Sequence, residues 1–251
     1  MGLYGFFTLA AVAVLLALEI FFTRNEPHPS RYDRWYGNVA LGFTNELIRF
    51  GWPLLLLYLA VAQPVAMVDA SVLGPTLGAL VAILLMDLAA YWLHRLSHLW
   101  PWLWRLHRTH HSDLDLDVST TFRHHPGEIG VHLILVTAMV GALGFTAVQL
   151  LPYILLSRCV SLWSHANIRL PATMERPLTW FLVTPRVHQI HHSAWRPETD
   201  SNYGQVLTLW DRLFHTYVSP DDVPCPARFG LERFRSVDDQ RLGALFAQPI
   251  R

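Results

Sequence analysis

The sequence predicts an all-α integral membrane protein with about four to five membrane helices, including a helical hairpin, and a cytoplasmic histidine-rich helical cap. Three observations support this fold class. Apolar residues make up 52% of the 251 residues, whereas charged residues make up only 15%. Several apolar runs are long enough to cross the ~30 Å hydrocarbon layer of a bilayer. The histidines concentrate between and after these runs, in repeated short patterns.

Four apolar stretches account for the predicted membrane helices. They are Leu3–Phe22, Phe50–Met67, Thr76–Leu93 and Ile129–Trp163. The first is interrupted only by Glu19, which we place near the membrane interface. The last spans 35 residues with Gly141, Gly144 and Pro152 around its middle. It therefore predicts a hairpin with two arms of about 17 residues, which is short enough to be re-entrant or tilted.

The distribution of arginine predicts the orientation in the membrane. All nineteen basic residues are arginine, and the net charge is zero, which argues against nucleic acid as a partner. With the N-terminus outside, the external segments are 1–5, 68–75 and about 142–152, and none of them contains an arginine. Positive charge is enriched in cytoplasmic segments. The histidine clusters are therefore expected on the cytoplasmic side.

Motifs for the common organic cofactors are missing from the sequence. Cys159 and Cys225 form no C-x-x-C pair, so neither a rubredoxin-like module nor a disulfide framework is expected. The chain also has no G-x-G-x-x-G or G-x-x-x-x-G-K-[ST] motif. A built-in nicotinamide, flavin or ATP site is therefore not expected.

The histidine patterns predict a dinuclear metal centre. Residues 107–111 and 188–192 both read H-x-x-H-H, a spacing that places three imidazoles on one helical face. His94 and His98 share a face in the same way. One metal ion takes roughly four to six ligands, and imidazole suits zinc, iron, copper and nickel. Together with single histidines at 125 and 165, ten histidines would serve two ions.

Polar residues near these clusters are candidates to support them. Asp87 and Tyr91 lie on the same helical stripe as His94 and His98. A carboxylate in hydrocarbon is costly unless it is paired, and we expect Asp87 to orient a ligand histidine through its second ring N–H. The alternative is that Asp87 pairs with an arginine or hydroxyl group on a neighbouring helix.

Residues 124 and 125 leave a choice. Either histidine could reach the metals, and we favour His125. The histidines that we expect not to be ligands are His28, His124, His132 and His215.

The order of the motifs resembles the fatty acid hydroxylase/sterol desaturase superfamily of membrane di-iron enzymes. The resemblance covers roughly residues 80–218. It rests on H-x-x-x-H, H-x-x-H-H, a pattern like H-P-x-E, S-H-x-N and the second H-x-x-H-H. It continues through Thr199-Asp200-Ser201-Asn202-Tyr203-Gly204 and Trp210-Asp211-Arg212-Leu213-Phe214. Within the superfamily, the pattern is most similar to bacterial sterol desaturase-like members and alkylglycerol monooxygenases.

The resemblance implies a set of ligands and supporting residues. It implies that two iron ions, with zinc possible in isolated protein, are bound by His94, His98, His107, His110, His111, His125, His165, His188, His191 and His192. The expected supporting residues are Asp87, Tyr91, Asn167, Asp200, Asn202 and Asp211. Two positions depart from the family. His215 stands where glycine is frequent, and Arg169 rather than histidine follows His165 by four residues.

The resemblance also implies a function. The expected reaction uses O2 and external electrons to hydroxylate, or desaturate, a C–H bond of a membrane lipid. The electrons would come from a separate ferredoxin-, rubredoxin- or cytochrome-type donor. The expected location is a bacterial inner membrane with the site on the cytoplasmic side. The alternative is a histidine-rich metal-transporting or metal-binding membrane protein, but a transporter should carry its histidines in mid-span.

These expectations divide the chain into three parts. Residues 1–67 form N-terminal transmembrane helices, 68–218 form the di-iron domain, and 219–251 form a cytoplasmic tail outside the metal core.

Overall fold

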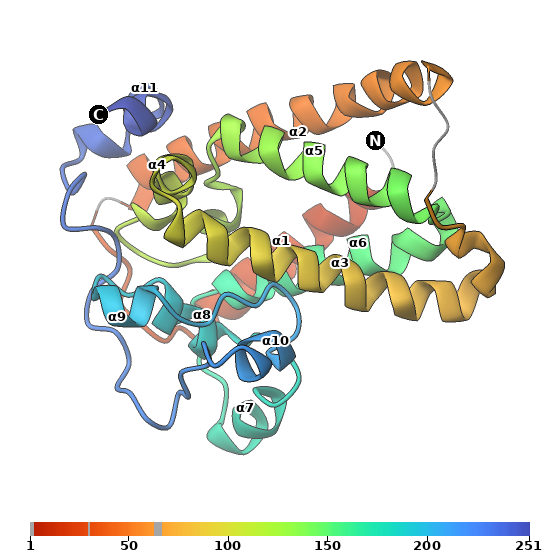
Figure 1. Cartoon of the computed structure of the whole chain (residues 1–251). Coiled ribbons are helices and arrows are strands. Elements are labelled where there is room, and N and C mark those ends of the chain that lie inside the picture. Colours follow the sequence, from red (N-terminus) through yellow and green to blue (C-terminus); the bar gives the residue numbers. More distant parts are fainter. Residues whose placement is uncertain (1–2, 30, 63–66) are drawn as a thin grey trace.

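The computed structural model describes residues 3–29, 31–62 and 67–251, and its regular elements within these ranges are helices joined by loops (Figure 1). Within these ranges, β structure is limited to three isolated β-bridges. The long helices are α1 (Leu3–Phe21), α2 (Arg31–Ala62), α3 (Gly74–Leu99), α5 (Pro126–Leu143) and α6 (Ala147–His165). The short helices are α4 (Pro101–His111), α7 (Ala172–Leu178), α8 (Pro185–His191), α9 (Arg196–Thr199), α10 (Leu209–Leu213) and α11 (Leu242–Ala247). Four 3-10 turns complete the list: η1 (Ala70–Leu73), η2 (Val118–Phe122), η3 (Asp238–Gln240) and η4 (Gln248–Ile250).

Three stretches of the described chain are long and apolar enough to cross a membrane. They are Ala70–Leu99, Pro126–Leu143 and Ala147–His165, while Gly5–Phe21 is a shorter apolar helix. The second predicted span, Phe50–Met67, falls partly outside the described residues, because α2 is described only to Ala62. The fold class is therefore a helical membrane protein, and the count of four to five spans stays a prediction.

The predicted hairpin consists of α5 and α6. Gly144 ends α5 in the left-handed conformation (φ 67°), which glycine adopts without strain. Thr146 then begins α6 through a capping box with Gln149. The break therefore lies at 144–146, and Pro152 is inside α6 rather than at the turn. The two arms also diverge, because α5 packs along α2 whereas α6 packs along α3 and α1.

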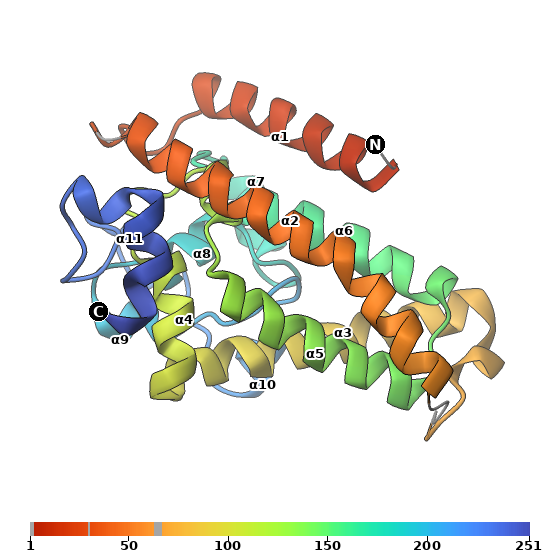
Figure 2. The same ribbon diagram turned by 90° about the horizontal axis from the view of Figure 1, so that it is seen from above.

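The polar segments gather at one end of the long helices. In Figures 1 and 2 the C-terminal ends of α1, α3 and α6 and the N-terminal ends of α2 and α5 lie at this end, together with α4, α8, α9 and α11. We call this end the cap. At the opposite end the two segments predicted to be external lie together. There Val68 N–H donates to the Ala142 carbonyl over 3.0 Å, and Gln149 Nε2 donates to the Gly74 carbonyl over 2.9 Å.

A buried ionic network ties α2 to the loop that follows α4. Arg34 is fully buried; it donates from Nε to Asp113 and from Nη1 to Asp117 Oδ2 over 3.1 Å. Arg123 completes the network by donating to Asn38 Oδ1 over 3.0 Å. Burial by itself would raise the pKa of Asp113, but the two guanidinium groups hold it at about 2. The loop is thus anchored directly after the first H-x-x-H-H motif.

Residues 219–251 contain no histidine, but they are packed against the cap rather than forming a detached tail. Arg123 Nη2 donates to Gln240 Oε1 over 2.9 Å, and Ser112 Oγ donates to Gln248 Oε1 over 3.3 Å. Both glutamines are buried. Helix α11 also packs on α2. This segment therefore supports the loop at 112–123.

Candidate metal centre

Two adjoining groups of histidines lie at the cap ends of the long helices. The first contains His94, His98, His107, His111 and His191, and the second contains His110, His165, His188 and His192. Helices α3, α4, α6 and α8 supply them, with His192 directly after α8. Within each group, one potential ligand atom of every residue lies within 4.8 Å of the others. The structure thus brings together nine of the ten histidines that the sequence predicted.

Local sequence explains how α4 and α8 present these residues. Helix α8 begins at Pro185 after Thr184, whose hydroxyl accepts a hydrogen bond from Val187 N–H. Helix α4 begins at Pro101 directly after α3 ends at Leu99, so its histidines turn back toward those of α3. Proline in the first turn suits helix initiation because it lacks the N–H that would be unsatisfied there. Each H-x-x-H-H motif therefore ends a short helix with its imidazoles on one side.

The imidazoles converge through their Nε2 atoms. The Nε2 atom of His94 lies 3.1 Å from that of His107 and 3.0 Å from that of His191. In the second group, Nε2 of His165 lies 3.1 Å from His110 and 3.0 Å from His188. Two nitrogens bound to one ion at ~2.1 Å stand about 3.0 to 3.4 Å apart. The observed separations fit ligands that share an ion.

The hydrogen bonds of His94 and His191 show why a cation fits between them. Nδ1 of His94 lies 2.9 Å from the Tyr203 carbonyl oxygen, and Nδ1 of His191 lies 2.7 Å from that of Ser201. Each Nδ1 must therefore carry the proton and donate it. The two Nε2 atoms then face each other as bare lone pairs at 3.0 Å. This contact is repulsive without a cation, and a metal ion turns both lone pairs into ligands.

Three further histidines are oriented in the same way. Nδ1 of His107 donates to Glu128 Oε1 over 2.8 Å, and Nδ1 of His165 donates to the Ser161 carbonyl over 2.7 Å. Nδ1 of His98 lies 3.2 Å from Asp200 Oδ1, while its Nε2 atom is buried without a hydrogen-bond partner among the described residues. An acceptor at Nδ1 fixes the tautomer and directs Nε2 to the centre.

Burial keeps five of the imidazoles neutral, those of His110, His111, His188, His191 and His192. Removal from water, followed by the neighbouring imidazoles, lowers the pKa of His110, His111, His188 and His192 well below the usual value. Burial likewise lowers the pKa of His191 to about 3. Metal ligands must be unprotonated imidazoles. These side chains are therefore ready to bind a cation at neutral pH.

The two groups touch each other through His111 and His192. Their rings are stacked, with centroids 4.5 Å apart and an interplanar angle of 19°. His192 also meets His110 edge to face with centroids 4.6 Å apart. A pair of ions held by the two groups would therefore be neighbours in one centre.

The expectation for His125 is not met, and His124 takes its place beside the centre. Nε2 of His125 lies 3.2 Å from the Phe246 carbonyl oxygen, at the surface and outside both groups. His124 instead stacks on His110, with centroids 4.2 Å apart, and donates from Nδ1 to Glu128 Oε1 over 3.1 Å. His125 is the N-cap residue of α5, and its Nδ1 accepts from Gly127 N–H over 3.0 Å, so its ring is held outside both groups.

Asp87 does not orient a histidine. It is fully buried, and its carboxylate accepts three hydrogen bonds. They come from the backbone N–H groups of Val206 and Leu207, both over 3.0 Å, and from Trp210 Nε1 over 2.9 Å. Neither an arginine nor a hydroxyl group is among these partners. Asp87 therefore holds the C-terminal segment against α3.

The other expected supporting residues divide into direct and indirect roles. Asp200 contacts a cluster histidine, as described for His98. Asp211 acts one step further out, since it accepts from Tyr203 N–H over 2.8 Å and so fixes the carbonyl that binds His94. Tyr91 O–H lies 2.9 Å from Thr216 Oγ1, away from the histidine nitrogens. Thus Tyr91 and Asp211 stabilise the segment 203–216.

The two asparagines hold backbone rather than metal ligands. Asn167 donates from Nδ2 to the Asn25 carbonyl over 2.7 Å and thereby fastens the chain after α1. Asn202, with φ 53°, accepts from Val218 N–H over 2.9 Å. His215 also has a positive φ, 57°, which explains why glycine is frequent at this position in the superfamily. Arg169 is turned away and donates to the Arg24 carbonyl.

Glu128 is the supporting residue that the sequence reasoning did not single out. It is buried and accepts hydrogen bonds from both His107 and His124. Its spacing of four residues from His124 was the available signal. The carbonyls of Ser161, Ser201 and Tyr203 carry no such signal, because every residue has one.

The family model described as fatty acid hydroxylase matches residues 79–216, which is more than half of the chain and contains every histidine of the two groups. The chain belongs to the fatty acid hydroxylase family. No solved structure matches the chain significantly.

Several characterised relatives are similar in sequence to this member of the fatty acid hydroxylase family over part of its length. The chain is 30% identical to the alkylglycerol monooxygenase of Homo sapiens over 141 residues, which is 56% of this chain and 31% of that protein. It is 31% identical to an ornithine lipid hydroxylase of Rhizobium tropici over 138 residues, 55% of this chain and 41% of that protein. It is 30% identical to a Delta(7)-sterol 5(6)-desaturase of Candida albicans over 152 residues, 56% of this chain and 34% of that protein. The chain thus spans less than half the length of these relatives.

Proposed function

We propose that this protein is a membrane-bound di-iron oxygenase. It uses O2 and electrons from a separate donor to hydroxylate, or desaturate, a C–H bond of a lipid. One observation carries the proposal: nine histidines, eight of them buried, form two adjoining groups whose Nε2 atoms converge at separations that suit shared ions. The names of the relatives, a monooxygenase, a lipid hydroxylase and a sterol desaturase, support this class of reaction.

The assignment of ligands follows the two groups. One iron would be held by His94, His98, His107, His111 and His191, and the other by His110, His165, His188 and His192. His124 lies beside the second group and is the candidate for its remaining position. When bound, the iron ions supply the O2-dependent redox chemistry that breaks an unactivated C–H bond.

The side chains of the chain provide orientation and exclude water. Tyr203, Ser201, Ser161, Asp200 and Glu128 hold the ring N–H groups, so the ligand atoms need not rearrange on binding a metal. All nine ligand candidates except His94 are buried, which keeps bulk water from a reactive centre. Helices α3 and α6, which carry His94, His98 and His165, are candidate membrane spans. An alkyl chain from the bilayer would therefore approach the centre along them.

Electrons must enter from outside, since no motif for a redox cofactor occurs in the sequence. Four arginines close to the histidine motifs in the sequence could dock an acidic donor: Arg105, Arg108, Arg186 and Arg196. Arg108 already donates a hydrogen bond to the Arg251 carbonyl over 2.8 Å, and Arg186 donates one to the Val223 carbonyl over 2.7 Å. Arg105 and Arg196 lie at the surface, where Arg196 Nε also donates to Asp200 Oδ2 over 2.7 Å. Arg196 covers Trp104 at 4.8 Å, and the Trp104 ring lies 5.0 Å from His98, so the donor would dock over this pair.

The function is tested by comparing lipids and metal in matched strains. We expect a deletion strain to lack an oxygenated or unsaturated lipid that wild-type protein restores, whereas His111→Ala does not. The control is His125→Ala, which removes a histidine outside both groups and should restore the lipid. Two iron ions per chain are expected after anaerobic loading. Unchanged lipids, together with altered cellular metal content, would favour the transporter alternative.

The orientation is tested separately. We propose that the cap lies on the cytoplasmic side of a bacterial inner membrane, because the arginines are concentrated at this end. Reporter fusions at residues 70 and 251 should give opposite readouts. The same readout at both positions would refute this topology.

A further inference from the structure

We propose that a segment made of two neighbouring stretches, residues 177–185 and 203–214, dips into the cytoplasmic leaflet and contacts lipid acyl chains, although it follows the last membrane helix. Residues 165–251 contain no apolar run long enough to cross a bilayer, so the sequence by itself predicts that they are extramembrane. Four independent features of the segment support its immersion: its depth along α3, its exposed side chains, its scarcity of charge and the pairing of its backbone. The inference does not depend on the proposed enzymatic reaction.

The depth follows from the contact with Asp87. Trp100 and Trp102, which are 52% and 54% exposed, mark the membrane interface at the end of α3. Asp87 lies 13 residues before Trp100, which is about 20 Å along a helix axis. Its carboxylate binds the N–H groups of Val206 and Leu207. Figure 1 accordingly shows α10 alongside α3, whereas α11 lies at the end of the long helices.

The surface of this segment is apolar. Trp180 and Phe181 are 63% and 70% exposed, and Leu209 and Leu213 are 46% and 57% exposed. The two leucines are four residues apart on α10 and therefore share one face. We call these four residues the apolar patch. Such a contiguous patch is costly in water but not next to acyl chains.

Charge is nearly missing from the segments that carry the apolar patch. Residues 177–185 contain no charged residue, and residues 203–214 contain only Asp211 and Arg212. Asp211 is buried and accepts three hydrogen bonds. Arg212 donates to the Thr179 carbonyl over 3.0 Å, and its guanidinium lies 4.2 Å from the centre of the Trp180 ring. Both charges are therefore turned inward, as immersion in lipid requires.

The backbone of the segment is paired in the way that hydrocarbon demands. Leu182 and Leu207 form an antiparallel bridge, and Val183 N–H donates to the Val206 carbonyl over 2.9 Å. Thr208 N–H donates to the Phe181 carbonyl over 3.2 Å. With Asp87 satisfying Val206 and Leu207, irregular backbone at this depth retains its hydrogen bonds. The buried carboxylate of Asp87, although it lies within a membrane helix, thus supplies the acceptors that this backbone needs.

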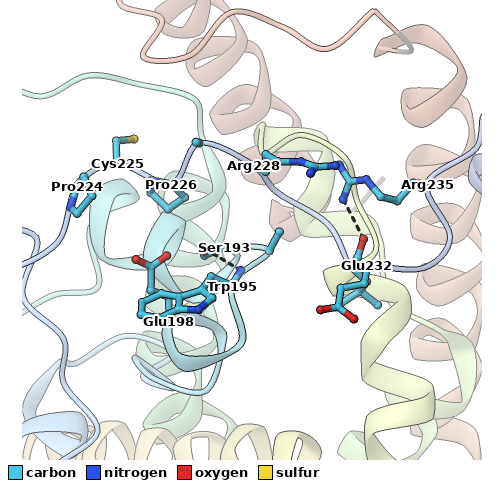
Figure 3. A pocket seen from close by; sticks show the side chains of 12 residues that line it. Ser193, Trp195, Glu198, Pro224, Cys225, Pro226, Arg228, Glu232 and Arg235 are labelled. Carbon is cyan, nitrogen blue, oxygen red and sulfur yellow. Dashed lines mark hydrogen bonds between the residues drawn. The ribbon is translucent and has the colours of Figure 1, made fainter.

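The remaining cap surface provides a contrast. Figure 3 shows a cleft there of about 590 Å³, lined by charged side chains that include Glu198, Arg228, Glu232 and Arg235. Cys225 also lines this cleft and is exposed. The charged side chains on this face favour contact with water. The two faces of the C-terminal region therefore differ in the solvent that they suit.

The native cysteines provide the reference positions for a test. Cys159 is exposed on α6, a candidate span, and Cys225 is exposed on the polar face. Spin labels at single cysteines would be compared in phosphatidylethanolamine/phosphatidylglycerol proteoliposomes. The probes are Phe181→Cys, Leu209→Cys and Leu213→Cys in a background with both native cysteines replaced by serine. Collision with apolar O2 and with a water-soluble nickel chelate reports immersion.

We expect the three probes to resemble Cys159, with several-fold higher accessibility to O2 than to the chelate, and Cys225 to show the reverse. Probes that resemble Cys225 would overturn the proposal. A second experiment uses the unaltered protein in bilayers that contain a lipid with a photoreactive acyl chain. Adducts are expected on peptides from 174–186 and 205–216. Adducts on α3 without any on these peptides would also overturn it.

Discussion

The imidazole of His107 donates from Nδ1 to Glu128 Oε1, 2.8 Å away, and so presents its Nε2 atom to the first histidine group. The same carboxylate oxygen accepts from Nδ1 of His124 over 3.1 Å. One buried side chain at the start of α5 therefore orients two imidazoles that come from α4 and from the turn before α5.

Replacement of Glu128 should weaken metal binding without removing a ligand. We expect Glu128→Ala to lower iron affinity or activity by about 10–100-fold, because His107 and His124 lose the acceptor that fixes their tautomers. Glu128→Gln should be milder, since its amide oxygen can still accept one hydrogen bond. Iron titration of the apoprotein measures the effect. Glu232→Ala on the exposed cap surface is the control, and equal affinities in Glu128→Ala and this control would contradict the assignment.

Adjacent histidines should respond differently to substitution. We expect His124→Ala to reduce iron content or activity, because this ring stacks on His110 and shares Glu128 with His107. His125→Ala should leave both unchanged, because its ring contacts the Phe246 carbonyl at the surface. Elemental analysis and product formation on the same preparations decide between them. Loss of iron in His125→Ala alone would instead identify His125 as the ligand.

Asp87→Asn should act mainly on stability. An amide nitrogen cannot accept a hydrogen bond, so at least one of the three donors from Val206, Leu207 and Trp210 loses its partner. A buried donor left unsatisfied costs about 1–3 kcal/mol. Thermal unfolding in detergent should shift downward relative to Asp221→Asn, an exposed aspartate in a surface ion pair. An unshifted transition with lost iron would instead indicate a direct role at the centre.

Arg34→Met should be among the most destabilising substitutions. It leaves Asp113 and Asp117 buried without the cation that pairs with both. Removing one partner of a buried ion pair lowers the free energy of unfolding by about 3–5 kcal/mol. Denaturant unfolding measures the free energy, and Arg241→Met is the matched control because the Arg241 side chain is 73% exposed. Similar stabilities for the two variants would show that the network does not stabilise the cap.

Truncation after Ser219 tests the role of the C-terminal residues. No histidine is removed, yet Arg123 loses Gln240 and Ser112 loses Gln248. We therefore expect a lower unfolding temperature and a reduced iron content at that temperature. Truncation before His188 should abolish iron binding at any temperature, because three ligand candidates are lost together. Full stability after truncation at Ser219 would mean that the tail packs on the cap without supporting it.

The sequence by itself determined the family, the helical membrane class and the nine histidines that make up the two groups. These features are encoded in local patterns: hydropathy over about 20 residues and the spacing of i, i+3 and i+4 along a helix. His107, His110 and His111 share a helical face wherever α4 is placed. The clusters could therefore be identified before any tertiary contact was known.

Tertiary structure alone decided which atoms support the histidines. The acceptors for His94, His165 and His191 are backbone carbonyls, which no side-chain pattern reveals. The choice between His124 and His125 depends on the direction of one turn, and the partners of Asp87 are 119 to 123 residues away in the chain. Hydrogen bonding acts over about 3 Å in space and is indifferent to separation along the chain. Sequence spacing therefore predicts which ligands share a face, but only the fold determines what holds them.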